Sequence, residues 1–277
     1  MSSRLPEGWR LILSKPLTGA ENMALDEAIL EAVGVGDSAP TFRLYAWNPP
    51  CLSLGFSQKI ADVDKKLLSE QGWDLVRRPT GGRAILHTDE LTYSIHAPAN
   101  YPHLQGDVLS SYRYLSKGLL KGLELMGVET EVQPSQQPTE ADKLDDPVCF
   151  LAPSAYEITH GGKKLLGSAQ TRRKNSILQH GTLPLTGDIA RICEVLVYAD
   201  EPARQQSARQ ILDRATTLEH ASARIVRWGE AAQAMVEGLA SALGIEFTEA
   251  PATAAELRRA ETLASERYQN STWTERA

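Results

Sequence analysis

Residues 161–185, GGKKLLGSAQTRRKNSILQHGTLPL, do most to decide the fold. Gly161 and Gly162 separate two runs of β-forming residues, SAYEITH before them and KKLLGSAQTRR after them. Two glycines between such runs predict a tight hairpin. The segment SILQHGTLPL then predicts one more strand. Consecutive strands, rather than strands alternating with helices, therefore dominate this part of the chain.

Two adjacent lysines begin the second strand of this hairpin. Neighbouring side chains of a strand point to opposite faces, so Lys164 should share a face with Leu166 and Ser168, and Lys163 should lie on the other. The small residues that follow, Gly167, Ser168 and Ala169, would let a ligand chain lie against the backbone. A small-residue strand packed under a helix explains them about equally well.

Outward from this stretch, apolar periodicity predicts the other elements. The predicted strands are GWRLILS (8–14), TFRLYAW (41–47), PPCLSLGF (49–56), DLVRRPT (74–80), RAILH (83–87), ELTYSIHAP (90–98), ETEVQP (129–134) and IEFTEA (245–250). The predicted helices are AENMALDEAILEAVG (20–34), DVDKKLLSEQG (62–72), DVLSSYRYLSKGLLKGLELMG (107–127), ARIVRWGEAAQAMVEGLASALG (223–244) and TAAELRRAETLASERY (253–268). Asp62 is a plausible cap and Gly72 a plausible stop for the second helix. The proline-rich segment 134–147 has no period and predicts a mobile loop.

The order of these elements indicates the fold class. Strands dominate the first part of the chain, and from Gly187 onward the pattern is mostly helical. This order predicts an α+β fold, with a mixed or antiparallel β-sheet flanked by helices, rather than repeated βαβ units. We expect one domain over residues 1–277, of which 187–277 is the helix-rich C-terminal part.

Composition excludes several classes of protein. The 277 residues carry a formal net charge of −6, so no overall basic surface indicates nucleic-acid binding. Three cysteines without paired spacing predict neither a disulfide framework nor a zinc knuckle, so we expect no metal and a reducing, cytoplasmic location. The N-terminus lacks the features of a signal peptide, and no apolar run is long enough to cross a membrane.

The segment RRPTGGRAILH, residues 77–87, is the first candidate site. Gly81 and Gly82 would let the backbone approach a ligand closely, and their N–H groups could form an anion-binding nest. Arg77, Arg78 and Arg83 would add positive charge, and His87 a further hydrogen-bonding group. On spacing alone, a tight hairpin with its arginines in water is the favoured interpretation.

Two further candidates are a histidine and a cysteine. His180-Gly181, inside an apolar strand, predicts a bulge or a close backbone approach, and such a histidine is more often structural than catalytic. Cys149 follows the acidic segment KLDDPV, whereas Cys51 and Cys193 lie among apolar neighbours and should be buried. A reactive thiol needs a cation nearby, and Lys164, 15 residues further on across the hairpin, could supply it.

At these residues the sequence resembles a known family. RRPTGGRAILHTDELTYSI, GKKLLGSAQTRRKNSILQHGTLPL and NMALDEAIL are similar to segments of the biotin/lipoate A/B protein ligases, which include lipoate-protein ligases and octanoyltransferases. The resemblance implies a mixed sheet flanked by helices, like the catalytic domains of biotin protein ligases and class II aminoacyl-tRNA synthetases. It implies that an acyl pocket is lined by residues that match the motifs, namely Arg77, Arg78, Gly81, Gly82, His87, Gly167, Ser168 and Ala169. The invariant lysine of the family corresponds to Lys164.

The position of the cysteine separates the branches of this family. VCFLAPSAYEI followed by GKKLLGSAQTR resembles the octanoyltransferase branch typical of Gram-positive bacteria, in which the cysteine precedes the lysine. Cys193 lacks the Pro-Cys-Gly context of another octanoyltransferase branch. An ATP-dependent lipoate ligase, an octanoyl amidotransferase acting between lipoyl domains, and a non-enzymatic lipoyl-domain binding module remain alternatives.

The resemblance implies a mechanism and partners. Lys164 would lower the pKa of Cys149, whose thiolate would take octanoyl from octanoyl-acyl carrier protein without any cofactor. The acyl group would then pass to a lysine of a lipoyl domain, such as glycine cleavage H protein. We expect a monomer in the cytoplasm, with neither nucleic acid nor membrane as a partner. Arg172, Arg173 and Lys174 are a candidate docking patch for the acidic carrier, although a solvated strand end explains them somewhat better.

Overall fold

The computed structural model describes residues 8–133 and 157–276 of the chain. The predicted loop 134–147 and Cys149 lie outside the described residues. The strands are β1 (Trp9–Leu13), β2 (Thr41–Tyr45), β3 (Cys51–Leu54), β4 (Asp74–Arg77), β5 (Ile85–His87), β6 (Glu90–Pro98), β7 (Glu131–Gln133), β8 (Glu157–His160), β9 (Lys163–Arg172), β10 (Ser176–Pro184) and β11 (Phe247–Glu249). The helices are α1 (Gly19–Val35), α2 (Lys65–Glu70), α3 (Val108–Leu125), α4 (Glu201–Arg214), α5 (Leu218–Ser222), α6 (Trp228–Leu243), α7 (Ala254–Leu263) and α8 (Ser271–Thr274), with 3-10 turns at Ile60–Asp62 and Ile189–Glu194 and a π-helical turn at Ala264–Tyr268.

The strands form two sheets in the described part of the chain. The larger sheet has the order β11-β1-β2-β6-β10-β9-β8-β7, and the smaller one the order β4-β3-β5. In the larger sheet β1 runs parallel to both β11 and β2, whereas the other neighbours are antiparallel. The prediction of a mixed sheet flanked by helices is confirmed.

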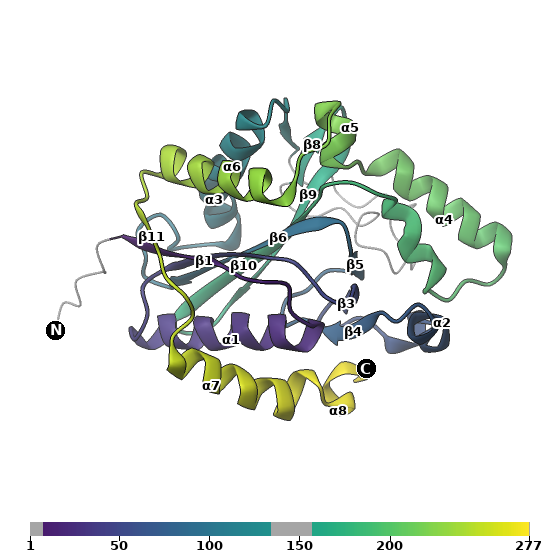
Figure 1. Cartoon of the computed structure of the whole chain (residues 1–277), viewed down its shortest axis with the longest axis horizontal. Helices are drawn as coiled ribbons and strands as arrows, with labels where there is room; N and C mark the ends of the chain where they lie inside the picture. Colours follow the sequence, from purple (N-terminus) through teal and green to yellow (C-terminus); the bar gives the residue numbers. More distant parts are fainter. Residues whose placement is uncertain (1–7, 134–156, 277) are drawn as a thin grey trace.

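Helices cover both faces of the larger sheet. Figure 1 shows α3 and α6 on one side of the sheet and α1 on the other, with α7 packed on the outer side of α1. The α3–α6 contact is close because glycines meet there: a Cβ on Gly238 would lie 2.3 Å from the backbone nitrogen of Gly122. The largest apolar cluster lies between these two helices and the sheet, and includes Phe42, Leu119 and Leu239.

The C-terminal part of the chain returns to the sheet at its far edge. Strand β11 pairs with β1, and α7 packs against α1, so residues after Gly187 contribute to both the sheet and its covering layer. Figure 1 shows α8 and the C-terminus beside β4, at the smaller sheet. Among the described residues, no helix combines the length and the apolar character that a membrane crossing requires.

Most of the predicted elements are confirmed, including the long helix α3, which Asp107 caps through the backbone N–H of Ser110. The hairpin at Gly161-Gly162 is also present, and both glycines have positive φ angles. The predicted cap at Asp62 is wrong. Asp62 lies in a 3-10 turn, and Asp64 caps α2 by accepting from the backbone N–H groups of Lys66 and Leu67.

The predicted hairpin at Gly81-Gly82 is also wrong. Strands β4 and β5 do not pair with each other, because each pairs with a different edge of β3. The segment between them passes the end of β3, where a Cβ on Gly55 would lie 1.7 Å from the carbonyl oxygen of Gly82. Gly55 therefore permits the two backbones to touch, whereas Gly82 is favoured by its positive φ angle of 96° and by the Arg78 guanidinium that a Cβ there would meet.

Candidate active site

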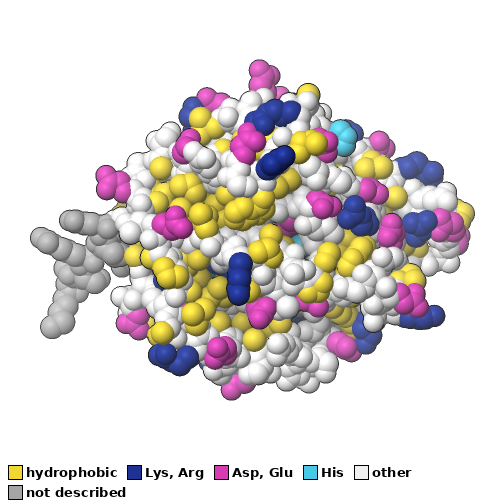
Figure 2. All heavy atoms as spheres, in the orientation of Figure 1, with side chains coloured by type: hydrophobic (Ala, Val, Ile, Leu, Met, Phe, Trp, Pro, Cys, Tyr) yellow, Lys and Arg dark blue, Asp and Glu magenta, His cyan; other side chains and the backbone are white. Residues whose placement is uncertain are grey.

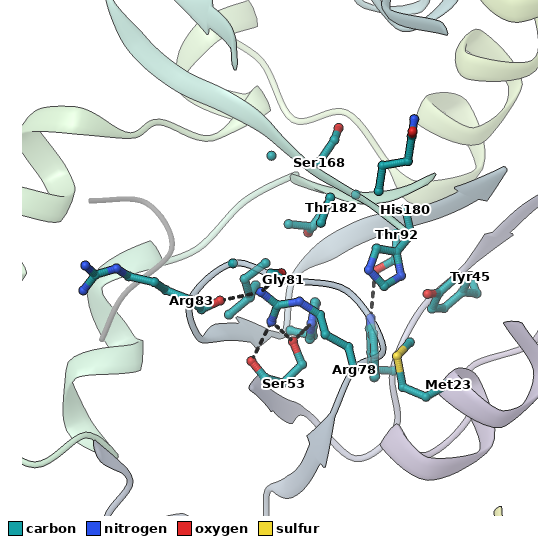
Figure 3. A pocket seen from close by; sticks show the side chains of 18 residues that line it. Met23, Tyr45, Ser53, Arg78, Gly81, Arg83, Thr92, Ser168, His180 and Thr182 are labelled. Carbon is teal, nitrogen blue, oxygen red and sulfur yellow. Dashed lines mark hydrogen bonds between the residues drawn. The ribbon is translucent and has the colours of Figure 1, made fainter. Parts of the chain in front are cut away.

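A cavity of about 270 Å³ lies where the two sheets meet. Its walls come from α1, from strands of both sheets and from the segment between β4 and β5 (Figure 3). The lining residues are Met23, Tyr45, Trp47, Ser53, Arg78, Gly81, Gly82, Arg83, Ile85, His87, Thr92, Gly167, Ser168, Ala169, Gln170, His180, Gly181 and Thr182. Of the ten residues that the sequence predicted for the site, seven line this cavity, Arg77 and Lys164 are not among the lining residues, and Cys149 lies outside the described residues.

Arg78 shapes the glycine-rich wall of the cavity. Its Nη1 donates to the carbonyl and the hydroxyl of Ser53 at 3.0 and 3.1 Å, and its Nη2 donates to the carbonyls of Gly81 and Arg83 at 3.0 and 2.7 Å. Gly82 has a φ of 96° and lies against the same guanidinium group. The buried arginine thus fixes the course of the backbone from 81 to 83, whereas the Arg83 side chain points away from the cavity (Figure 3).

His87 has its ring orientation set from both sides. Its Nε2 lies 2.8 Å from Ser53 Oγ and its Nδ1 lies 2.7 Å from Glu90 Oε1, while Trp47 stacks on the ring at 4.1 Å. Burial alone would raise the pKa of the Glu90 carboxyl, but His87 and the Thr92 hydroxyl hold it below the ordinary value. His87 therefore presents a fixed ring to the cavity, with a carboxylate behind it.

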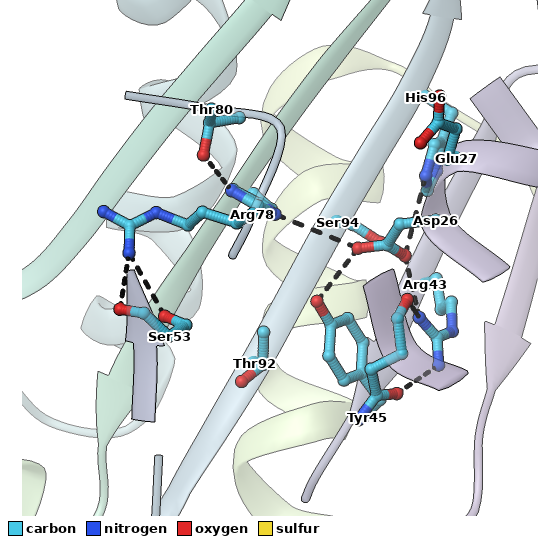
Figure 4. A network of polar contacts seen from close by, with 12 residues as sticks. Asp26, Glu27, Arg43, Tyr45, Ser53, Arg78, Thr80, Thr92, Ser94 and His96 are labelled. Carbon is cyan, nitrogen blue, oxygen red and sulfur yellow. Dashed lines mark hydrogen bonds and ion pairs between the residues drawn. The ribbon is translucent and has the colours of Figure 1, made fainter. Parts of the chain in front are cut away.

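A buried polar network supports the floor of the site (Figure 4). Asp26 accepts hydrogen bonds from Arg43 at 2.7 Å, from the Tyr45 hydroxyl at 2.9 Å and from Ser94 at 2.8 Å. Burial opposes ionisation of this carboxyl, but Arg43 and the hydrogen bonds hold its pKa well below the ordinary value. The network keeps a charge inside the protein next to a cavity wall, and ties the middle of α1 to β2 and β6.

His180 joins this network to the glycine-rich segment. Its Nε2 lies 2.7 Å from Thr80 Oγ1, and its Nδ1 lies 3.9 Å from Asp26. Burial lowers the pKa of the His180 ring, which favours the neutral form. The prediction that His180 is hydrogen-bonded is confirmed, and its ring also lines the cavity.

Gly181 confirms the predicted close backbone approach. A Cβ at this position would lie 2.3 Å from the Gly167 carbonyl oxygen and 2.6 Å from the Tyr93 ring. Pairing of β10 with β6 is continuous from Ser176 to Pro184, so the approach involves no bulge in that ladder. Ser168 Oγ lies 2.6 Å from the Tyr93 hydroxyl, which ties the small-residue strand to β6.

A register shift places Lys164 differently from the sequence expectation. Thr159 pairs with Lys164 and Ile158 pairs with Leu166, so Leu165 is skipped. The extra residue turns the Lys164 side chain toward Gly167, whose Cβ, if present, would lie 3.2 Å from Lys164 Cε. The predicted grouping of Lys164 with Leu166 and Ser168 is therefore wrong.

Lys164 is buried beside the cavity wall. Its side chain is 3% exposed, and its Nζ donates to Glu157 Oε1 at 2.6 Å. Lys163 instead donates to the carbonyl of Leu212 at 2.6 Å, on the outer side of the strand. Because Gly167 lines the cavity and a Cβ on it would lie 3.8 Å from Lys164 Nζ, the amino group of Lys164 lies directly behind this part of the wall.

Arg77 is not among the residues that line the cavity, although the resemblance implied that it lines an acyl pocket. Its guanidinium donates to the carbonyls of Gly55, Gln58, Thr274 and Arg276 at 2.6 to 3.0 Å. It thus joins the C-terminal segment to the turn that touches Gly82. Cys51 and Cys193 are buried, as predicted, and burial raises the pKa of the Cys51 thiol.

The basic run at the end of β9 does not form a free patch. Arg172 donates to the carbonyls of Leu104, Gly106 and Asp107 at 3.0 Å. Arg173 pairs with Glu27 although its side chain is 37% exposed, and Lys174 is exposed. On the face in Figure 2, basic side chains are scattered among acidic ones. The run serves the protein's own packing, which counts against the docking hypothesis.

The site residues predicted from the sequence did not include the apolar and hydroxyl side chains that close the cavity. Met23 lies in α1, Tyr45 in β2, Thr92 in β6 and Thr182 in β10, and Trp47 lies between β2 and β3. Thr92 and Thr182, which lie directly opposite each other on β6 and β10, could have indicated the site from the sequence. Hydroxyl groups in otherwise apolar central strands need hydrogen-bond partners, which a polar cavity can provide.

Comparison with known proteins agrees with this geometry. Residues 18–240 match the family model of the lipoyl protein ligase A/B catalytic domain, and the chain belongs to that family. It is 38% identical over 271 residues to the octanoyltransferase LipM of Brevibacillus brevis, covering 96% of this chain and 98% of the relative. It is 39% identical over 273 residues to that of Kyrpidia tusciae, covering 97% and 98%.

Solved structures with the same fold are lipoate-protein ligases. A bipartite lipoate-protein ligase from Thermoplasma acidophilum superposes with a TM-score of 0.81 at 24% identity, covering 98% of this chain and 97% of the other. Lipoate-protein ligase A bound with ATP gives a TM-score of 0.79, also at 24% identity, covering 98% and 99%. These likenesses establish the fold that the two sheets and their helices form.

Proposed function

We propose that this protein is an octanoyltransferase of lipoate biosynthesis. The observation that carries the proposal is the cavity between the two sheets, with the buried Lys164–Glu157 pair directly behind its Gly167 wall. Full-length similarity to octanoyltransferases, at 36–39% identity, supports the same conclusion. The glycines along the wall leave room for a slender acyl chain.

The cavity suits a medium-length acyl group. Trp47, Tyr45, Met23 and Ile85 supply apolar surface, and about 270 Å³ is near the lower end of small-molecule sites. Removing the methylene groups of an octanoyl chain from water contributes about 5 kcal/mol, at ~0.8 kcal/mol for each group. This energy would hold the chain while its carbonyl stays at the Gly167 end of the cavity.

The proposed reaction has two acyl transfers. The Cys149 thiolate, stabilised by the Lys164 ammonium, attacks the thioester carbonyl of octanoyl-acyl carrier protein. The bond to the carrier sulfur breaks, and the carrier leaves as a thiol after taking a proton. The ε-amine of an acceptor lysine then attacks the octanoyl-Cys149 thioester, the Cys149 sulfur leaves, and the amine proton passes to it.

The chemistry needs an oxyanion site and no nucleotide. Backbone N–H groups near Gly81-Gly82 or Ser168-Ala169 would donate to the tetrahedral oxyanion. Because a thioester is converted to an amide in the last step, the transfer proceeds without ATP. Arg78 and His87 would act by holding the cavity walls in place, and Arg77 by anchoring the turn behind them.

The proposed donor is octanoyl-acyl carrier protein and the acceptor is a lipoyl domain, with glycine cleavage H protein as the preferred candidate. We place the reaction in the reducing cytoplasm, where an unpaired thiol such as Cys149 persists. The whole chain, 1–277, would act as one catalytic domain and as a monomer. The helix-rich part 187–277 belongs to that domain in this proposal, because β11 and α7 complete its sheet and its covering layer.

Transfer assays separate this proposal from its rivals. Incubation with octanoyl-acyl carrier protein and apo H protein, without ATP, should yield octanoylated H protein by mass spectrometry. A lipoate ligase would require ATP and the free acid, and would give no product in this mixture. An amidotransferase would use octanoylated H protein as its donor and another lipoyl domain as acceptor, so a preference for that pair would overturn the assignment.

A further inference from the structure

We propose that Glu157 is a positioning residue for the acyl transfer, because it holds Lys164 as an ammonium ion against the cavity wall. This inference rests on the proposed function, in which Lys164 stabilises the Cys149 thiolate. It adds a third member to that pair: a carboxylate that orients and charges the lysine, as the third residue of a catalytic triad orients its base. Glu157 lies in the segment VCFLAPSAYEI, which resembles the family, but the resemblance implied no role for it and it does not line the cavity.

The first part of the argument is the contact itself. Glu157 Oε1 lies 2.6 Å from Lys164 Nζ, and the side chains are 19% and 3% exposed. A surface pair of this kind would contribute little, but a nearly buried lysine depends on its partner. Burial alone favours a neutral amine, whereas a carboxylate at this distance favours the ammonium form. A neutral Lys164 could not stabilise a thiolate.

The second part is the register shift. By skipping Leu165, β9 brings Lys164 round to the side of Gly167, and Glu157 is the next residue along β8 beyond the shifted pair. The irregularity therefore places the lysine beside Gly167, while Glu157 lies on the same face of β8 as Thr159, the residue that pairs with Lys164. A regular ladder would have placed Lys164 with Leu166 and Ser168 instead.

Other charged groups around Lys164 are placed less favourably. On its own strand, Lys163 points to the carbonyl of Leu212. On the segment packed against the lysine backbone, where the Thr216 N–H donates to the Lys164 carbonyl at 2.9 Å, the titratable residues nearest in the chain are Asp213, Arg214, Glu219 and His220. Glu219 is half-buried and the other three are exposed. Among the described residues, Glu157 places a carboxylate oxygen within ion-pair distance of the Lys164 ammonium, at 2.6 Å.

The charge of Glu157 should affect both limbs of the pH profile of acyl-enzyme formation: the rise, as Cys149 loses its proton, and the fall, as Lys164 loses its own. Glu157→Gln keeps an oxygen that can accept from Lys164 but removes the negative charge. Without it, Lys164 loses its proton at a lower pH, and the Cys149 thiolate forms at a lower pH. The profile of acyl-enzyme formation should therefore move toward acid by about one pH unit, the size of a neighbouring-charge effect.

The experiment measures octanoyl adduct formation and iodoacetamide alkylation of Cys149 from pH 5 to 10, in the wild-type enzyme, Glu157→Gln and Glu131→Gln. Glu131, an exposed residue on the adjoining strand β7, provides the matched control. We expect both limbs to shift in Glu157→Gln and neither in Glu131→Gln. Glu157→Ala, which also removes the acceptor oxygen, should lower the maximal rate at least tenfold.

The outcomes distinguish this inference from the function on which it rests. If the wild-type enzyme forms a Cys149 adduct and the Glu157→Gln profile superimposes on it, Glu157 has no positioning role and the transferase proposal stands. If the wild-type enzyme forms no adduct at Cys149 at any pH, the proposed function itself fails. A merely structural role for Glu157 would lower the amplitude of adduct formation without moving either limb.

Discussion

Gly167→Ala tests whether the position of Lys164 controls acyl transfer. The added Cβ would lie 3.2 Å from Lys164 Cε and 3.8 Å from Nζ. Since carbon atoms normally rest about 3.5–4.0 Å apart, the lysine must retreat by roughly half an ångström. A displacement of about 1 Å can cost a hundredfold in rate, so we expect roughly tenfold slower transfer, or about 1.4 kcal/mol in activation free energy.

The assay is the initial rate of octanoyl transfer from acyl carrier protein to apo H protein, with urea unfolding run in parallel. Gly229→Ala is the matched control, because its Cβ would have no heavy atom within 4 Å and Gly229 lies in α6, away from the cavity. Both variants should keep their free energy of unfolding within about 1 kcal/mol of wild type. A hexanoyl donor separates the causes: a narrowed cavity would spare it, whereas a displaced lysine slows both donors equally. Wild-type rates in Gly167→Ala would refute the reasoning.

Three further substitutions address the packing around the site. Gly181→Ala should lower the free energy of unfolding by about 3 kcal/mol, because its Cβ would lie 2.3 Å from a carbonyl oxygen of β9; an unchanged urea midpoint would contradict this. Arg77→Met should also cost about 3 kcal/mol, since several carbonyls lose a buried charged donor, whereas the exposed Lys66→Met should cost almost nothing. Burial lowers the pKa of His96 to about 4. Between about pH 6.5 and 4 the histidine is therefore protonated in the unfolded chain but neutral in the folded one. The free energy of unfolding should fall by about 3 kcal/mol as the pH drops through this range. Urea midpoints across that window should show this loss in wild type and in the exposed His220→Gln, but not in His96→Gln; equal slopes in all three would exclude His96 as the cause.

Local patterns were sufficient for the elements of this fold. Helix α3 carries its own cap at Asp107 and a clear apolar stripe, and the Gly161-Gly162 turn has no competing role, so both follow from the sequence. The alternation of apolar and polar residues likewise located the strands of both sheets. These features depend on neighbours in the chain, which a sequence displays directly.

Long-range contacts decided the features that the sequence could not predict. Gly55 must be a glycine because a Cβ there would meet the carbonyl of Gly82, 27 positions later in the chain, and a local interpretation turned the pair at 81–82 into a hairpin. Arg77 is held by carbonyls of the C-terminal segment, far away in the chain. The register shift at Leu165 depends on how β8 pairs with β9. Strict alternation of side chains along β9, which ignores this shift, puts Lys164 on the face of Leu166 and Ser168 instead of the face of Gly167.

Intact mass spectrometry after incubation with octanoyl-acyl carrier protein tests the central claim most directly. We predict a mass increase of one octanoyl group on the wild-type chain and on Cys51→Ser and Cys193→Ser, whose thiols are buried. The same increase should be absent from Cys149→Ser. An octanoyl adduct that survives in Cys149→Ser would contradict the account, because the acyl group would then travel on another residue.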